Sequence, residues 1–370
     1  MPDLYAEYQF RLNVLSPIAA DSPFDSDTLW GRLVCALMAG SEVERELAGQ
    51  WLEELRDLRT HPATGWRPPV LLSEGFPCDD NGTPWLPLPL AARLQLEQQA
   101  PTETRKDAKK IESLPLDVFA RTCQAGPPPL GELAPLQARR PRAIPALHPR
   151  LAMNRASGTG IEGMLFISQS HVYSSSSHGA AGNSTTAREA TSAQQRGSAE
   201  IVFFLRLGDG ENVSLIEPAL KRICEEGWGS AKSRGLGRVA FKALQPWQPP
   251  AFANQPGGFV SLSAFCPAAH DPTEGYWKLD VKNPVPAQFV DGRRVALGEE
   301  DRWRVKSFLR LRAGSCFRLP DGAMKSHYGR MLSDLLEPAE DAEGNPLPPM
   351  FHYALAFPVP MRWPREQPHG

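Results

Sequence analysis

The chain has 370 residues, enough for two or three domains, and its 41% hydrophobic and 22% charged residues are typical of a soluble globular protein. No apolar run approaches the about 18 residues of a membrane span, and no signal peptide opens the sequence, so we expect a cytoplasmic protein without a membrane partner. The net charge of −2 disfavours a free-standing nucleic-acid binder; any nucleic acid would be held by a local patch inside a larger assembly.

The first third of the sequence predicts two strands and two helices. Apolar and polar residues alternate over 8–14, as in a half-buried strand. Ser26 is a good N-cap for the helix that follows, and Asp27 suits the positive end of that helix. The next predicted elements are a helix over 41–58 and a strand over 70–73.

The middle of the chain predicts long connections between strands. Residues 127–149 are rich in proline and arginine and indicate an extended crossing. The segment 174–198 is rich in Ser, Ala, Gly and Thr and has almost no apolar anchors, so we expect it to be mobile. It joins a predicted strand over 163–167 to another over 201–207, as the tip of a long hairpin would.

Short strands dominate the rest of the chain. A helix over 218–226 and a strand over 239–244 flank a glycine-rich segment. The later predicted strands are 258–265, 277–281, 303–308 and, as the last one, 353–357. Helices alternate with strands without regular parallel crossovers, which favours two α+β sandwich domains of the split β-α-β type.

The most informative segment is the glycine-rich loop over 227–238, which holds two G-x-G pairs and three cations. Glycine lets a ligand approach the backbone closely, and the cations suit phosphate. The residues expected to bind there are Gly227, Gly229, Lys232, Ser233, Arg234, Gly235, Gly237 and Arg238. Trp228 could stack on a base or pack under the loop.

The flanks of this loop exclude the common nucleotide-binding loops. Walker and Rossmann loops follow a strand and open a helix, whose positive end faces the phosphate. Here the loop follows a helix, so the nearby helix end is negative and a nucleotide cofactor is not expected. The simplest alternative is a structural glycine turn beside a solvated basic surface.

Several separated segments resemble one known family. They are Ser26–Trp30, Leu72–Pro77 with Leu86–Pro89, Asn154–Thr159 with Glu162–Phe166, the double G-x-G loop, and Tyr353–Val359. In this order they are similar to motifs of subunit four of the type III-A CRISPR effector (the Csm complex), which belongs to the RAMP superfamily and is related to the Cas-five group. The glycine loop alone marks only the superfamily, whereas the ordered set covers nearly the whole chain.

The resemblance implies an α+β fold of two ferredoxin-like (RRM-like) RAMP domains with the glycine-rich loop and an inserted mobile hairpin tip. The implied domains are 1–145, the N-terminal ferredoxin-like domain; 146–250, the rest of the RAMP core; and 251–370, the C-terminal ferredoxin-like domain.

The resemblance also implies a scaffold without catalysis, cofactor or metal. It would hold the 5′ tag of the CRISPR RNA (crRNA), dock the large Cas-ten subunit and contact a backbone RAMP subunit. Arg155 is a further expected RNA-binding residue, and the hairpin that carries it would reach target RNA indirectly, as a thumb at the edge of the guide–target duplex.

Two other kinds of function are open. Some RAMP relatives cut precursor crRNA without metal, with histidine as acid or base. The candidates here are His148, His171, His178, His327 (with Tyr328 and Lys325) and His352, and no two of them share a short motif. The six cysteines form no CxxC pair, and no HExxH motif is present, so we expect no metal site. A stand-alone binding module is the second alternative.

Overall fold

The computed structural model describes most of the chain. The described residues are 5–21, 23–60, 66–153, 156–157, 159–175, 199–208, 213–254, 256–284, 289–290, 293–294, 306–333, 335 and 351–364. Among their helices, none is both long and apolar enough to cross a membrane.

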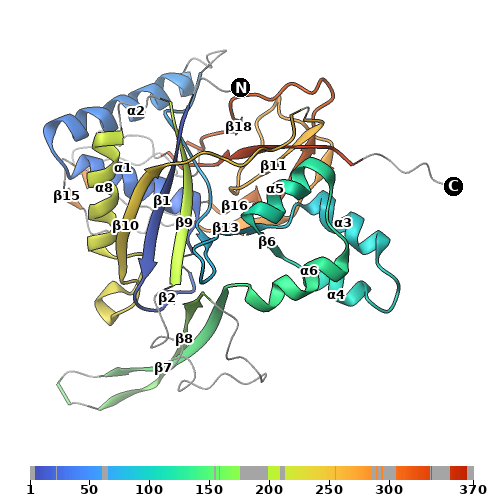
Figure 1. Ribbon diagram of the computed structural model, residues 1–370. Coiled ribbons are helices and arrows are strands. Elements are labelled where there is room, and N and C mark those ends of the chain that lie inside the picture. Colours follow the sequence, from blue (N-terminus) through green and yellow to red (C-terminus); the bar gives the residue numbers. More distant parts are fainter. Residues whose placement is uncertain are drawn as a thin grey trace.

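The main sheet brings together strands from both ends of the first 250 residues (Figure 1). Its order is β10-β1-β9-β3, and β4 also pairs with β9. The bounds are Ala6–Val14 (β1), Val70–Leu72 (β3), Phe76–Pro77 (β4), Ala199–Leu207 (β9) and Val239–Pro246 (β10). All pairs are antiparallel, with Phe10 opposite both Phe203 and Leu244. The strands predicted over 8–14, 70–73, 201–207 and 239–244 are confirmed.

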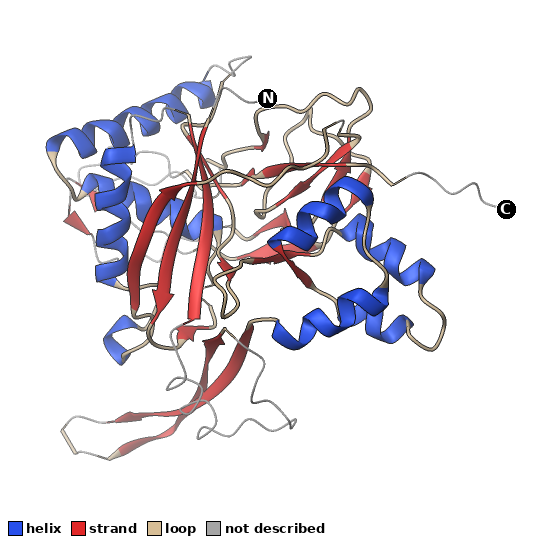
Figure 2. Cartoon of the chain, viewed as in Figure 1, coloured by secondary structure: helices blue, strands red, loops and turns tan. Residues whose placement is uncertain are grey.

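Three helices lie on one side of this sheet (Figure 2). They are α1 (Ser26–Met38), α2 (Glu42–Thr60) and α8 (Val213–Glu226). In α8, Ile216, Ala219, Leu220 and Ile223 are buried at the three-to-four-residue spacing of one helix face. One detail was predicted wrongly: the N-cap of α1 is Asp25, without a side-chain capping bond, and Ser26 is already helical.

A second antiparallel sheet is built from the last third of the chain. Its order is β12-β17-β11-β20, with bounds Gly258–Ser261 (β11), Gly275–Tyr276 (β12), Cys316–Arg318 (β17) and Pro358–Met361 (β20). The described residues from 256 onward form no helix. Instead α3 (Leu90–Gln99) and α5 (Leu116–Ala125) contact β12 and β20. Helices from the first half of the chain therefore pack against strands from the last third.

Smaller elements complete the fold. The paired strands are β13 (Leu279–Lys282) with β16 (Phe308–Leu311), β14 (Phe289–Val290) with β15 (Arg293–Arg294), β18 (Tyr328–Gly329) with β19 (Leu355–Ala356), and β5 (Trp85–Pro87) with β6 (Ser113–Pro115). The remaining helices are α4 (Arg105–Lys110), α6 (Leu130–Leu136), η1 (Gln137–Arg139) and η3 (Lys232–Arg234). Antiparallel sheets with separate helices confirm the α+β class.

A long hairpin projects from this body (Figure 1). It consists of β7 (Arg142–Met153) and β8 (Gly160–Ser174), and β8 also pairs with β2 (Ile18–Ala19). The predicted hairpin was therefore wrong in its partner: among described residues β8 pairs with β7 and β2, and β9 pairs within the main sheet. Of the segment predicted to be mobile, residues 176–198 lie outside the described residues.

Two further predictions need correction. The segment 127–149 is not a simple extended crossing, because α6 and η1 precede β7 within it. The strand at 353–357 is shorter than predicted and is not the last, since β20 follows it. Prolines at 358 and 360 hid β20 from sequence reasoning; both are tolerated because β11 is the only described partner of that strand.

One hydrophobic core links the two sheets. It runs from Phe10 and Leu12 on β1 to Val359 and Met361 on β20, all of them buried. Within it the hydroxyl of Tyr353 accepts a hydrogen bond from the backbone amide of Leu72 (2.8 Å). The sheets therefore form one continuous packed unit.

Candidate nucleic-acid interface

The glycine-rich loop begins where α8 ends. Gly227 has φ +81°, and its amide donates to the carbonyl of Cys224 (3.1 Å). A positive φ at this place is the usual glycine stop signal of a helix, as the sequence predicts. The loop therefore leaves the helix at a fixed angle.

The base of the loop is closed by its own backbone. The Trp228 amide donates to the Gly237 carbonyl (2.6 Å), and the Gly237 amide donates to the Pro17 carbonyl (2.8 Å). A Cβ on Gly237 would lie 1.9 Å from the Trp228 carbonyl oxygen, and one on Gly227 would lie 2.9 Å from the Gly237 carbonyl oxygen. The close approach at these two glycines is thus to protein backbone.

Trp228 packs beneath the loop. Its side chain is fully buried, its indole N–H donates to the Pro23 carbonyl (3.2 Å), and its ring lies 4.9 Å from the ring of Phe24 and 5.6 Å from that of Phe203. The guanidinium of Arg32 covers the ring at 5.4 Å. Of the two roles considered for this tryptophan, packing under the loop is the one observed.

The crown of the loop faces solvent. The 3₁₀ turn of Lys232, Ser233 and Arg234 is exposed, and it is bounded by Ala231 (φ 59°) and Gly235 (φ 81°) in the left-handed conformation. Gly235 has nothing within 4 Å of where a Cβ would lie. Open space at Gly235 leaves room for a ligand to approach the backbone.

Ser230 and Arg238 connect the loop to residues 15–21 by hydrogen bonds. Ser230 donates to the carboxylate of Asp21 (2.8 Å). Arg238 has an exposed side chain, while its amide donates to the Ser16 hydroxyl (2.8 Å) and its carbonyl accepts from the Leu15 amide (2.8 Å). Gly229 has φ +78° and is half-buried.

The two arginines of the loop are not neutralised by acidic side chains in the described part of the chain. Neither Arg234 nor Arg238 forms an ion pair with a described residue. A guanidinium held above a closed backbone base, without a carboxylate partner, is suited to bind a phosphate oxygen.

The projecting hairpin lies at the same end of the molecule as this loop. The segment that supports Gly237 and Arg238 continues into β2, where Ile18 pairs with His171 and Ala19 with Ser170 of β8 (Figure 1). Arg155, predicted to bind RNA, lies outside the described residues, in the connection between β7 and β8. The structure therefore brings the loop and the hairpin together, without placing the Arg155 side chain.

Two of the candidate histidines, His148 and His327, contact neighbouring side chains. His148 hydrogen bonds through Nε2 to the Ser170 hydroxyl (2.7 Å) across the hairpin. His327 packs edge-on against Trp66 (5.5 Å), and burial lowers its pKa. Its neighbour Tyr328 is buried and stacked on Phe259 (4.0 Å). His171 lies on β8, and His178 is outside the described residues.

A buried charge cluster joins α1 to the last third of the chain, and sequence reasoning missed it. Asp27 lies 2.9 Å from Lys282, 3.5 Å from Arg310 and 3.2 Å from Nε2 of His352. Asp25 also contacts Lys282 and Arg310, both at 2.9 Å. The only sequence signal for this cluster was the S-D-T-L-W motif. The motif explained Asp27 by its place at the helix end and gave no sign of distant partners.

Asp27 and Glu74, which accepts a hydrogen bond from the Ser26 amide beside it (3.0 Å), have opposite pKa shifts. Although burial disfavours its charged form, Asp27 has a lowered pKa because His352, Lys282 and Arg310 all favour the carboxylate. Burial raises the pKa of Glu74 to about 8, and the negative charge of Asp25 adds to this. The cluster is a clasp that joins α1 to β13, β16 and His352. No described group of His, Cys, Asp and Glu side chains could hold a metal ion.

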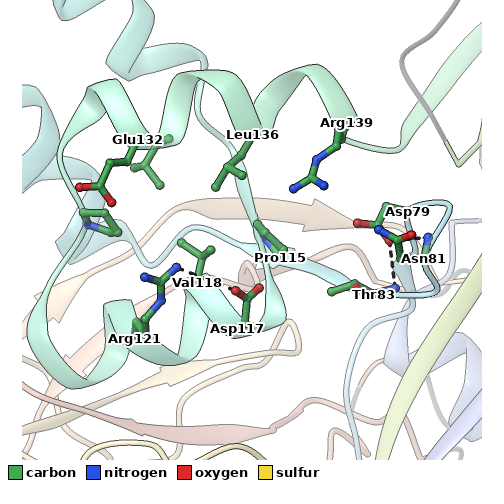
Figure 3. Close-up of a pocket in the computed structure, with 12 residues that line it drawn as sticks. Asp79, Asn81, Thr83, Pro115, Asp117, Val118, Arg121, Glu132, Leu136 and Arg139 are labelled. Atoms are coloured by element: carbon green, nitrogen blue, oxygen red, sulfur yellow. Dashed lines mark hydrogen bonds and ion pairs between the residues drawn. The ribbon is translucent and has the colours of Figure 1, made fainter.

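One cavity of about 290 Å³ lies between α5, α6 and the loop at 79–83 (Figure 3). Arg121 and Arg139 point into it, as Figure 3 shows. Three carboxylates also line it, those of Asp79, Asp117 and Glu132. The carboxylates outnumber the guanidinium groups, which disfavours the binding of an anion in this cavity.

Comparison with known proteins identifies the fold. Neither a protein-family model nor a curated protein matches the sequence. A chain of the crystal structure of the Csm1-Csm4 cassette in complex with AMPPNP is 17% identical, with a TM-score of 0.52, covering 97% of this chain and 99% of that one. A chain of the Type III-B Cmr-beta complex bound to cognate target RNA and AMPPnP is 11% identical over 84% of this chain and 86% of that one, with a TM-score of 0.39. The match to the Csm1-Csm4 cassette chain confirms, at the level of the fold, the resemblance predicted from the sequence.

Proposed function

We propose that this chain is a non-catalytic, RNA-binding scaffold subunit of a type III CRISPR effector complex, and that it holds the 5′ tag of the crRNA. The observation that carries the proposal is the exposed cationic turn of the glycine loop, in a chain that is similar in fold over 97% of its length to a Csm1-Csm4 cassette chain. Such a subunit would act in antiviral defence, in the cytoplasm, without a cofactor.

The loop would grip RNA through the phosphates. Lys232, Arg234 and Arg238 supply charge-assisted donors, and the Ser233 hydroxyl supplies a neutral one. A single strand can place successive phosphates on such donors while its bases splay outward. Gly235 is the position where the strand can come closest to the loop backbone, since the space there is open.

The partners follow from the type of complex. We expect the chain to dock the large Cas-ten subunit and to contact a backbone RAMP subunit. The β7–β8 hairpin, with Arg155 in its turn region, would reach the edge of the guide–target duplex and so meet target RNA indirectly. The support for this is the position of the hairpin, which projects beside the glycine loop (Figure 1).

The proposed fold is a pair of ferredoxin-like RAMP domains. The proposal of a first such domain is supported by the order β10-β1-β9-β3 with α1 and α8, which matches a β-α-β-β-α-β arrangement. The domain boundaries at 145 and 250 are part of the proposal. A second domain would use helices such as α3 and α5 from earlier in the chain, since these contact the second sheet.

Co-purification tests the proposal. The tagged chain would be expressed with its genomic neighbours, and any bound RNA would be sequenced. The expected result is a complex with a large polymerase-like subunit and short RNAs that share one 5′ sequence. A lone protein that cleaves repeat RNA would favour the RAMP nuclease alternative, and a lone protein without RNA would leave the loop a structural turn.

A further inference from the structure

The ribbon of β13 and β16 leaves one edge of β13 open. Among the described residues, β13 pairs with β16 alone. The other edge of β16 is occupied by Phe265, which exchanges two backbone hydrogen bonds with Leu311 (2.8 and 2.9 Å). In the described part of the chain, β13 is therefore the outermost strand of this small sheet.

The register shows which backbone groups of β13 point outward. In an antiparallel pair, residues that bond the partner strand alternate with residues whose groups point away from it. The Arg312 amide donates to the Lys278 carbonyl (2.9 Å), so Leu279 and Val281 take the alternate positions and turn their N–H and C=O groups away from β16. Leu311, opposite Leu279, follows the same rule, since its groups bond away from β13. No described residue bonds the outward groups of Leu279 and Val281.

The same part of the ribbon exposes apolar side chains. Leu279, Val281 and Leu309 lie on one face, because residues two apart in a strand, and residues directly opposite each other, share a face. They expose 58%, 58% and 59% of their surface. Lys282 and Arg310 lie on the opposite face, where they contact Asp25 and Asp27 in the clasp. The clasp thus holds one face of the ribbon, while the apolar face stays open to solvent.

An open edge of this kind is usually protected in proteins. Proline, a charged side chain or a bulge at an edge strand prevents another strand from pairing with it. The outward positions of β13 hold Leu279 and Val281 instead, and the pairing with β16 has no bulge. Free backbone donors and acceptors beside apolar side chains are what a strand of another protein recognises when it extends a sheet.

The charge at one end of the edge indicates a further property of the partner. Lys278 and Arg312 are opposite each other and exposed, and neither forms an ion pair with a described residue. Like charges directly opposite each other destabilise a ribbon, so a carboxylate from a partner would be favourable there. RNA would also bring anions, but it has no N–H and C=O groups in strand register and no alternating apolar side chains.

We propose that the free edge of β13 accepts an extended strand of a partner protein. The incoming strand pairs with the outward backbone groups of Leu279 and Val281. Its apolar side chains cover these two residues and Leu309, and a carboxylate at one end binds Lys278 and Arg312. The inference rests on the proposed function in one respect, the choice of the large subunit as the partner to test. It does not depend on RNA binding by the glycine loop.

Residue-resolved hydrogen exchange tests the pairing without any substitution. The full-length chain is measured alone, at two concentrations, and in the complex co-purified with the large subunit. In the chain alone, the outward amides of Leu279 and Val281 should exchange rapidly, whereas the amides of Asp280 and Lys282, which point to β16, should exchange slowly. In the complex, exchange at Leu279 and Val281 should slow by about tenfold or more.

Variants separate the backbone contribution from that of the side chains. Val281→Pro removes an N–H that points away from β16, so the ribbon is kept, and the affinity for the purified large subunit should fall by about tenfold or more. Val281→Ala keeps the N–H and should weaken binding only about threefold. Lys278→Glu should weaken binding about fivefold by repelling the carboxylate. Val43→Ser is the matched control, since Val43 is a 55% exposed aliphatic residue on α2, and it should leave the affinity unchanged.

Rapid exchange at Leu279 and Val281 in the complex overturns the proposal, as does a Val281→Pro variant that binds like Val43→Ser. Slow exchange of these amides in the chain alone also overturns it. If that protection is independent of concentration, another segment of this chain covers the edge; if it grows with concentration, a second copy does. A wild-type chain that recovers no large subunit contradicts this inference and the proposed function together. Recovery of the large subunit without protection of the edge contradicts this inference alone.

Discussion

Trp228 in the glycine loop and Trp277 at β12 have similar surroundings in the sequence, with glycine and lysine close by, but opposite roles in the structure. Trp228 is fully buried under a loop whose cations point outward. Trp277 is 47% exposed and stacks on Phe317 (6.2 Å). In the first region the aromatic ring supports the loop from beneath, and in the second one face of the ring stays open to solvent. Burial, and not residue type, separates the two.

The largest expected effect is the loss of stability when the ring of Trp228 is removed. Trp228→Ala removes a fully buried ring between Phe24 and Phe203, so the free energy of unfolding should fall by about 4 kcal/mol. Urea denaturation would measure it. Trp277→Ala in parallel is the comparison, and a similar loss in both variants would contradict the different roles of the two tryptophans.

The second prediction concerns the buried charge cluster that ties the start of α1 to β13 and β16. Asp27→Asn leaves Lys282 and Arg310 with fewer partners in a buried place, and should cost about 3 kcal/mol of unfolding free energy. Hydrogen exchange should increase over β13 and β16 more than in α8. Uniform exchange across the protein would show that the clasp does not hold β13 and β16 specifically.

The carboxyl groups at the clasp should also make the stability of the protein depend on pH, with one loss at acidic pH and another as the pH rises. Asp27 has a lowered pKa, so its stabilisation is complete above the ordinary value of 3.8 and is lost as the pH falls further. Glu74 has a pKa raised from 4.5 to about 8, so the stability it contributes is lost as the pH rises through this window. Denaturation from pH 3 to 9 should show both losses, and Asp27→Asn should lack most of the acidic one.

A pair of glycine variants sharpens the account of the loop. In Gly237→Ala the new Cβ meets the Trp228 carbonyl, which must move, in addition to the strain of a positive φ; we expect a loss of about 2 kcal/mol or more. Gly235→Ala has the same kind of φ but open space, so only about 1 kcal/mol is expected. Equal losses, measured by thermal denaturation, would mean that the base of the loop can relax.

The smallest effect belongs to the exposed ring. Trp277→Ala should change the free energy of unfolding by about 0.5 kcal/mol or less, because surface substitutions rarely cost more. A loss above about 2 kcal/mol would show that the stacking of Trp277 on Phe317 is structural, as the packing of Trp228 is.

Sequence periodicity predicted the elements that are long and regular. The strand β1 and the helix α8 bury one face, and their spacing reveals it, whereas β9 is buried on both faces and shows as a continuous apolar run. The C-terminal strands were predicted poorly, because β12, β19 and β20 are short and their residues are fixed by partners distant in the chain. Proline in β20 added to the difficulty, since it argues against a strand.

The same limit applies to the site. The glycine stop signal at Gly227 and the exposed cations of the loop could be predicted from local pattern. The role of Trp228 and the partners of Asp27 could not, because each depends on contacts between segments separated by more than 180 residues. Only the folded chain brings those residues together.

The most direct test of the central claim is the salt dependence of tag-RNA binding by the assembled complex. Wild type would be compared with the Lys232→Ala, Arg234→Ala, Arg238→Ala variant, and with a control in which the exposed Arg45, Lys306 and Arg330 are changed to alanine. We predict that the loop variant binds at least tenfold more weakly, with a salt slope lower by about 2, while the control is unchanged. Equal affinity and slope in all three proteins would contradict the claim that this loop binds the phosphates of the RNA.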